Sequence, residues 1–185
     1  MKVIENYENV QASSGEFARP TANGYICKII DVEDVPMNAK TGKGDYLRIE
    51  YDIDDGDFKG YYKEQFDKWG GNWNASFIRS YKEKALGMLK HFTNCIENSN
   101  AGYDWDWNEK GLIGKVVGLV LGEEEYINSN GEIRTKLVVS QIKTVEEIKN
   151  GDFKVPAPKK ITEENIASNP NGFSVISNDD DDLPF

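Results

Sequence analysis

The sequence predicts a mainly β protein, with a five-stranded barrel that carries one amphipathic helix between its third and fourth strands. Two observations predict this fold class. Short runs rich in β-branched and aromatic residues recur along the chain, separated by Gly, Pro and Asn turn signals. One longer stretch instead has apolar residues at three- and four-residue steps, which is helical spacing. With 38% hydrophobic and 11% aromatic residues, the chain has enough apolar material to close a core.

Three strands are predicted before the helix. Residues 25–32 and 45–53 form the first two, joined by a loop at 36–44. The acidic Gly-containing turn at 54–57 precedes a third β-rich run at 58–66, so the second and third strands are expected to form an antiparallel hairpin.

The helix and two further strands complete the fold. One apolar stripe predicts a helix over 75–96; it consists of Phe77, Tyr81, Ala85, Met88, Leu89, Phe92 and Ile96. Strands at 112–122 and 133–143 follow, joined by an Asn-Gly hairpin at 128–131, and a short helical turn is expected at 145–148. Strand, strand, strand, helix, strand, strand is the element order of the OB-fold, a Greek-key barrel that binds oligonucleotides or oligosaccharides.

Charge and composition divide the chain into four segments. We expect an N-terminal arm at 1–23, the OB-fold domain at 24–155, a flexible linker at 156–176 and an acidic tip at 177–185. Six of the 32 acidic residues, but no Lys or Arg, lie in residues 161–185, so the tail holds much of the net charge of −10. Its few apolar residues cannot offset the entropy of ordering, which predicts a disordered acidic tail.

Few residues point to catalysis, so we expect no enzymatic activity, cofactor or metal. The only histidine, His91, lies beside the apolar stripe and is interpreted as a surface residue rather than a general base. The aspartates of the 54–57 turn fit a solvated turn better than a calcium loop. Cys27 and Cys95 are predicted to be buried and unpaired. An acidic N-terminus without an apolar signal region, and the lack of a bilayer-length apolar run, predict a cytoplasmic protein.

Alternation along the second and third predicted strands suggests a nucleic-acid face. If Leu47, Ile49, Tyr51 and Ile53 point inward, then Tyr46, Arg48, Glu50 and Asp52 point outward. Phe58, Tyr62 and Phe66 pointing inward would leave Lys59, Tyr61, Lys63 and Gln65 on the same outer face. Aromatic rings that stack on bases, beside cations that contact phosphates, are typical of single-strand binding. The predicted face consists of Tyr46, Arg48, Lys59, Tyr61 and Lys63, with Lys40, Lys43, Trp69 and Trp73 as outer contacts.

Other roles for these aromatic residues remain open. Tyr46 and Tyr61 can instead form a cross-strand pair that stabilises a hairpin, with the lysines only solvated. Trp105 and Trp107 can stack on bases or sugar rings, although packing of their loop onto the barrel is the preferred interpretation because Asp104 and Asp106 would repel phosphate.

The C-terminal tip combines acidic and apolar residues in one short run: Asp179, Asp180, Asp181, Asp182, Leu183, Pro184 and Phe185. The terminal ring and its adjacent carboxylate suit an apolar pocket beside a cation, and the aspartates would steer the tip toward a basic rim. This tip resembles that of bacterial single-stranded DNA-binding proteins. The resemblance implies that it recruits DNA-processing enzymes such as a helicase, nuclease, primase or recombinase.

The body is more similar to the variant of this family found in phages and integrated elements of Gram-positive bacteria. The similar positions are Gly24-Tyr25, Lys43-Gly44, Gly60-Tyr61-Tyr62 and Ser80-Tyr81-Lys82. The resemblance implies a non-enzymatic protein of replication, recombination and repair that binds single-stranded DNA without strong sequence preference, with homo-oligomerisation open. An anionic tail that competes with DNA predicts tighter binding at low salt once residues 177–185 are removed. The alternatives are an acidic DNA mimic, or a carbohydrate-binding barrel that uses Trp69, Trp73, Trp105 and Trp107.

Overall fold

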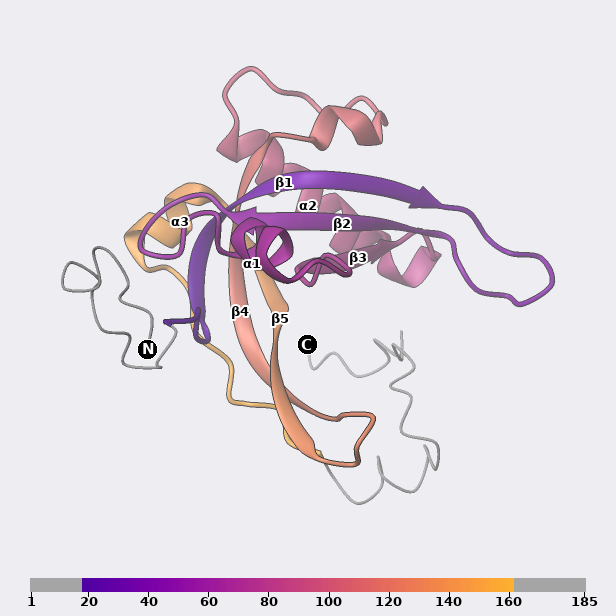
Figure 1. Cartoon of the computed structure of the whole chain (residues 1–185). Coiled ribbons are helices and arrows are strands. Elements are labelled where there is room, and N and C mark those ends of the chain that lie inside the picture. Colours follow the sequence, from indigo (N-terminus) through magenta and orange to yellow (C-terminus); the bar gives the residue numbers. More distant parts are fainter. Residues whose placement is uncertain (1–17, 162–185) are drawn as a thin grey trace, which may run out of the picture.

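The computed structural model describes residues 18–161, which form one five-stranded antiparallel sheet with helices on both sides (Figure 1). The strands are β1 Asn23–Val35, β2 Tyr46–Ile53, β3 Ser76–Ser80, β4 Val116–Ile127 and β5 Ile133–Lys143. Their order in the sheet is β3-β2-β1-β4-β5, so β1 pairs with both β2 and β4. The outer strands β3 and β5 also approach each other, which makes the sheet barrel-like. The predicted linker and tip fall mostly or wholly outside the described residues.

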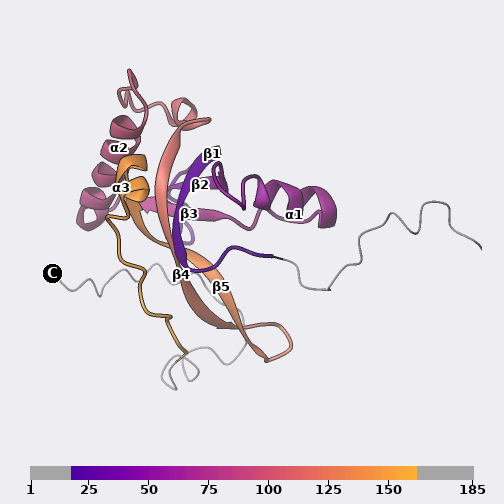
Figure 2. The ribbon, with the colours of Figure 1, turned by 90° about the vertical axis from the view of Figure 1, so that its left-hand side faces the viewer.

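Within residues 18–161, three α-helices cover different parts of the sheet. Helix α2 (Leu86–Ser99) packs against β3, β4 and β5, and α3 (Val145–Asn150) follows β5 directly. Helix α1 (Tyr61–Trp69) connects β2 to β3 and projects from the opposite side of the sheet, as Figure 2 shows. Single 3₁₀ turns lie at Glu83–Ala85 and Glu109–Leu112. The sheet therefore has one face toward α2 and α3 and another toward α1.

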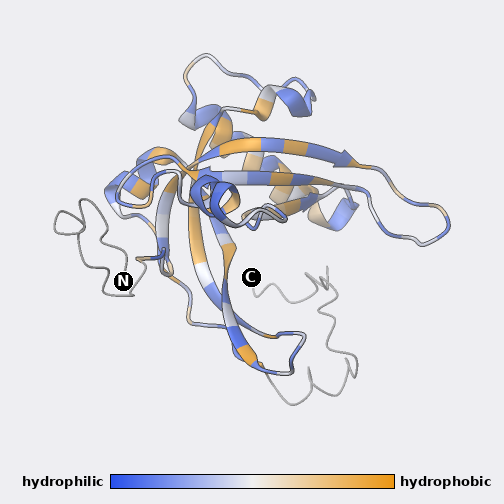
Figure 3. Cartoon of the chain, viewed as in Figure 1, coloured by the Kyte–Doolittle hydropathy of each residue, from blue (hydrophilic) through white to orange (hydrophobic). Residues whose placement is uncertain are grey.

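The core follows the alternation that the sequence predicts for the first two strands. Leu47, Ile49, Tyr51 and Ile53 of β2 are all at most 2% exposed. Alternating hydropathy along β1 and β2 is visible in Figure 3. Phe92 and Ile96 of α2 are fully buried in the same core, where the Phe92 ring lies 5.7 Å from that of Phe77 in β3. The predicted loop at 36–44, the strand at 133–143 and the Asn-Gly hairpin at 128–131 are confirmed.

The predicted third strand at 58–66 is wrong, because most of this segment belongs to α1. Phe58, Tyr62 and Phe66 recur every four residues, a step that suits one helix face as well as one strand face. The helix starts where Gly60 adopts a left-handed backbone with φ of 75°. Consequently Lys59, Tyr61, Lys63 and Gln65 do not share a strand face with Tyr46 and Arg48.

The actual β3 lies within the segment predicted as the start of the helix. Ser76–Ser80 pairs with β2 from Tyr46 to Glu50, and the helix begins only at Leu86. Phe77 and Tyr81 are again four residues apart, so they fitted the helical stripe as well as a strand. The predicted fourth strand also begins too early. Its start is fixed by Asn100, whose side chain donates to the Val116 carbonyl at 2.8 Å and accepts from the Val116 amide at 3.0 Å.

Asp52 was predicted to point outward, but it is buried, with 5% of its surface exposed. Its carboxylate accepts hydrogen bonds from the amides of Tyr62 and Lys63 at 3.0 and 3.1 Å, and from Ile53 at 2.8 Å. Helix α1 has no side-chain cap of its own. Asp52 of β2 therefore accepts from the free amides in the first turn of α1, although it lies ten residues earlier in the chain.

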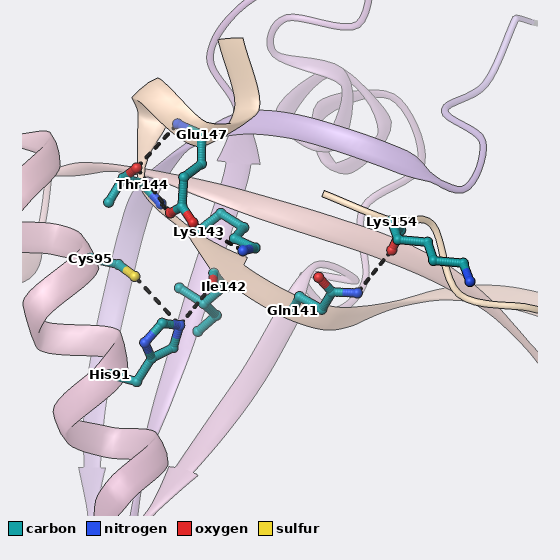
Figure 4. A network of polar contacts seen from close by, with 8 residues as sticks. All are labelled: His91, Cys95, Gln141, Ile142, Lys143, Thr144, Glu147 and Lys154. Atoms are coloured by element: carbon teal, nitrogen blue, oxygen red, sulfur yellow. Dashed lines mark hydrogen bonds and ion pairs between the residues drawn. The ribbon is translucent and has the colours of Figure 1, made fainter. Parts of the chain in front are cut away.

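The junction of β5 and α3 is fixed by a local hydrogen-bond network (Figure 4). Thr144 and Glu147 form a reciprocal capping box, and Lys143 pairs with Glu147 at 3.0 Å. His91 is exposed, as predicted, and its Nε2 lies 2.9 Å from the Ile142 carbonyl. Because a carbonyl only accepts, this nitrogen carries the proton. Cys27 and Cys95 are both free and buried, which confirms their prediction.

Candidate nucleic-acid interface

The loop between β1 and β2 presents two lysines to solvent. Lys40 and Lys43 are exposed and form no ion pair with any described residue. Asn38 organises the loop, because its side chain accepts from the amides of Lys40 and Thr41 at 3.0 and 3.2 Å. Its backbone amide donates to the Lys43 carbonyl at 2.7 Å. The two cations are therefore held on a shaped loop at the far end of the β1–β2 hairpin (Figure 1).

The outer face of β2 is less cationic than the sequence suggested. Tyr46 and Arg48 are half-buried on this face, but Arg48 bonds to Glu50 at 2.8 Å and lies 3.8 Å from Glu33 of β1. Asp31 lies opposite Glu50 in the strand register. Burial raises the pKa of Glu50, with Arg48 opposing and the two β1 acids reinforcing the shift. Glu50 and Glu33 offset the charge of Arg48, and Asp31 has its own cation in Lys110 at 3.8 Å, so the cations of this face are already matched by acids.

The cations predicted for the third strand lie instead around α1 and are ion-paired. Lys59 lies 3.8 Å from Asp54, and Lys63 pairs with Asp67 at 2.7 Å, four residues further along the helix. Both lysine side chains are about two-thirds exposed, at 67% and 66%. Exposed pairs of this kind contribute only about 0–1 kcal/mol. Either lysine can therefore exchange its carboxylate for a phosphate at small cost.

Tyr61 and Trp73 have structural roles. Tyr61 is half-buried and packs edge-on against Phe58 and Tyr62, with ring centroids 6.3 and 5.3 Å away. Trp73 is also half-buried, and its indole Nε1 donates to the Tyr51 carbonyl at 3.0 Å. The Trp73 hydrogen bond attaches the loop after α1 to β2, whereas Tyr61 packs on its own helix and on Phe58 just before it. Neither ring is a free platform for a base.

The C-terminal half of α1 carries the exposed aromatic surface of this region. Trp69 is 72% exposed and Phe66 is 41% exposed. The Nζ of Lys68 lies 5.2 Å from the centroid of the Trp69 ring. An open indole with a cation at its face combines the two groups that single-strand binding uses, base stacking and phosphate attraction. Phe66 was predicted to point inward, and the period-four ambiguity at 58–66 hid its exposure.

Arg79 of β3 was not among the predicted site residues, because the sequence predicted this segment as part of the helix. Arg79 stands opposite Leu47 in the β2–β3 register and is half-buried. Its guanidinium carbon lies 4.9 Å from the Phe77 ring centroid, and its Nη1 donates to the Ile78 carbonyl at 2.7 Å. These contacts hold Arg79 close to the strand.

The two tryptophans after α2 have different surroundings. Trp105 is half-buried against the core, and its amide donates to Glu97 at 2.8 Å. Trp107 is 77% exposed, with its ring centroid 6.1 Å from that of Trp105. The preferred interpretation of the loop as a packing element is therefore confirmed for Trp105 and wrong for Trp107.

The described part of the chain contains no group of three or more His, Cys, Asp or Glu side chains arranged to hold a metal ion. None of its helices has the length and apolar character that a membrane span requires. A scan against protein-family models and a search of curated proteins find no match to this chain.

Proposed function

We propose that this chain is a non-enzymatic protein that binds single-stranded DNA. The observation that carries the proposal is the strand connectivity. β1 pairs with β2 and β4, and β3 approaches β5. Along the chain, α2 comes between β3 and β4. From this connectivity we infer an OB-fold, a class of barrel that binds oligonucleotides across its second and third strands and the loops joining strands 1–2 and 4–5.

The groups available around that region support a strand path from the β1–β2 loop to α1. Lys40 and Lys43 lie on the loop that OB-folds use for ligand contact, and they have no acid partner among residues 18–161. Trp69 and Phe66 offer rings for bases, with Lys68 beside them. The acids on the outer face of β1 and β2 disfavour a path across that face.

Six further residues of the face predicted from the sequence have other roles in this proposal. Lys59 and Lys63 add exposed cations near α1, at the cost of breaking weak surface pairs. Tyr46 and Arg48 lie beside the β1–β2 loop and border the path. Trp73 anchors the loop after α1 to β2, and Tyr61 packs against its neighbour Tyr62 within α1.

The proposal also includes recruitment of DNA-processing enzymes by the tip from Asp179 to Phe185. This part rests on the sequence alone, because the tip lies outside the described residues. Its four carboxylates and terminal apolar residues suit a partner that has a basic rim around an apolar pocket.

Variants of the two binding elements test the interface. We expect Lys40→Ala combined with Lys43→Ala to weaken oligo-dT binding and to reduce the slope of log K against log salt by about 1.4. Trp69→Ala should weaken binding about fivefold or more, because one stacked base contributes about 1–3 kcal/mol. Trp107→Ala is the matched control, since this tryptophan is equally exposed but lies on a different loop. Oligo-dT affinity that is unchanged in both interface variants would exclude this path.

A further inference from the structure

A groove is lined by acidic and aromatic side chains, and none of its lining residues is among those proposed for the DNA path. It is bounded by β1, β2, the start of α2 and the loop that follows α2, and its volume is about 360 Å³. This is at the small end of the range of ligand sites, about 300–1,000 Å³. The lining residues are Asp34, Leu47, Tyr81, Leu86, Leu89, Trp105, Trp107 and Glu109.

The chemistry of the lining is that of a site for an organic cation. Leucines form the apolar part, three aromatic side chains stand around it, and no Lys or Arg lines the groove. The only charged lining residues are Asp34 and Glu109, and neither forms an ion pair with a described cation. Asp34 accepts a hydrogen bond from the Tyr81 hydroxyl at 2.9 Å. Burial raises the pKa of Tyr81, and the charges of Asp34 and Glu109 raise it further.

Trp107 is presented by an anchored loop. Its backbone has φ of 66°, a left-handed conformation that is unusual for a bulky residue, and its side chain remains 77% exposed. On either side, the Trp105 amide donates to Glu97 at 2.8 Å, and the Lys110 Nζ donates to the Val32 carbonyl at 2.7 Å. The indole therefore stands at the groove without collapsing into the core.

We propose that this groove binds a basic segment of a partner protein. An Arg or Lys side chain stacks on Trp107 and faces Asp34 and Glu109, while a neighbouring apolar side chain contacts the leucines. A guanidinium suits this arrangement because it stacks on aromatic rings and bonds to carboxylates.

Charge argues against the other occupants. Nucleic acid meets two carboxylates and no cation in the groove. The parts of this chain outside the described residues carry net negative charge, which does not complement an acidic groove. Residues 1–17 contain three Glu and one Lys, and residues 162–185 contain six acids and no Lys or Arg. A basic partner in trans is the complementary choice.

Calorimetric titration of the full chain with the peptide acetyl-Arg-Leu-Arg-Leu-Arg-amide tests the proposal. We expect binding that Trp107→Ala reduces about tenfold or more. Asp34→Asn combined with Glu109→Gln should reduce it about tenfold at low salt, and the difference should shrink at high salt because the charges are screened. Trp69→Ala, which removes an equally exposed indole outside the groove, should leave peptide affinity unchanged. Unaltered oligo-dT binding or circular dichroism of the groove variants shows that they are folded.

Several results would overturn the proposal. One is equal binding of acetyl-Glu-Leu-Glu-Leu-Glu-amide, which carries the opposite charge. Others are undiminished binding of the basic peptide by the Trp107→Ala chain, and no binding of the basic peptide at all. Binding of a neutral cello-oligosaccharide that depends on Trp107, without binding of the basic peptide, would instead assign the groove to sugars.

Discussion

Replacing Asp52 by alanine tests how α1 is attached to the sheet. The carboxylate is 5% exposed and accepts from three backbone amides, those of Ile53, Tyr62 and Lys63, at 2.8 to 3.1 Å. Two of these amides belong to the first turn of α1, which has no side-chain cap of its own. Alanine offers no acceptor, so one buried and two partly buried amides lose their partner.

The expected cost follows from these bonds. A lost helix cap costs about 1 kcal/mol, and hydrogen bonds to a charged acceptor contribute about 1.5–3 kcal/mol each, offset by the desolvation of the carboxylate. We therefore expect Asp52→Ala to lower the free energy of unfolding by about 2–4 kcal/mol. Asp52→Asn keeps one acceptor oxygen and should lose about half as much. Asp55→Ala is the control, because Asp55 is exposed and accepts only from the neighbouring Gly56 amide at 2.9 Å.

Urea denaturation followed by circular dichroism and tryptophan fluorescence measures these differences. Because α1 carries Trp69, Asp52→Ala should also weaken oligo-dT binding under conditions in which the chain remains folded. If Asp52→Ala changed the free energy of unfolding by no more than Asp55→Ala does, the attachment of α1 by this carboxylate would be refuted.

Three further predictions concern single positions. Gly44→Ala should lower the free energy of unfolding by about 2–3 kcal/mol, because at φ of 110° its Cβ would lie 2.2 Å from the Pro36 carbonyl oxygen. Gly42→Ala, where a Cβ meets open space, should lower it by about 1 kcal/mol. Equal urea midpoints for the two variants would contradict this prediction. The pKa of Glu147 is lowered, first by the Thr144 amide and then by Lys143, so its stabilisation is present above the unfolded pKa and is lost as the pH falls through the folded one. Glu147→Gln should therefore lower the free energy of unfolding at pH 7 by about 0.5 kcal/mol, a small effect because this side chain is 35% exposed. In acid, its thermal melt should match that of the parent. A loss of stability that persisted in acid would exclude the lowered pKa as the cause. Burial raises the pKa of the Cys27 thiol strongly and that of Cys95 to about 11. Ellman's reagent at pH 8 should therefore label both thiols only in urea. Rapid labelling of the folded protein would show that burial does not protect them.

The sequence predicted the parts of the fold in which hydrophobic alternation was unambiguous. β2 has Leu, Ile, Tyr and Ile at alternate positions, and those side chains are buried. β5 and the hairpin before it are marked by an Asn-Gly turn between β-rich runs. These signals are local, so one sequence is enough to locate them.

The segment from 58 to 81 could not be assigned in the same way. Its aromatic residues recur every four positions, which satisfies both a strand and a helix. The choice is made by tertiary contacts, namely the Asp52 carboxylate at the start of α1 and the pairing of β3 with β2. Because the predicted nucleic-acid face depended on a third strand in this segment, that face was wrong, while the lysines of the 36–44 loop and Trp69 remained exposed.

The central claim, that this fold binds single-stranded DNA, is tested most directly by a fluorescence anisotropy titration. A labelled oligo-dT of about 30 nucleotides and a matched duplex are titrated with the full chain, and with a chain that lacks residues 177–185, at low and high salt. We predict tight, salt-sensitive binding of the single strand, weaker binding of the duplex, and tighter single-strand binding at low salt without the tip. Absence of binding to oligo-dT, or equal affinity for the duplex, would contradict the account.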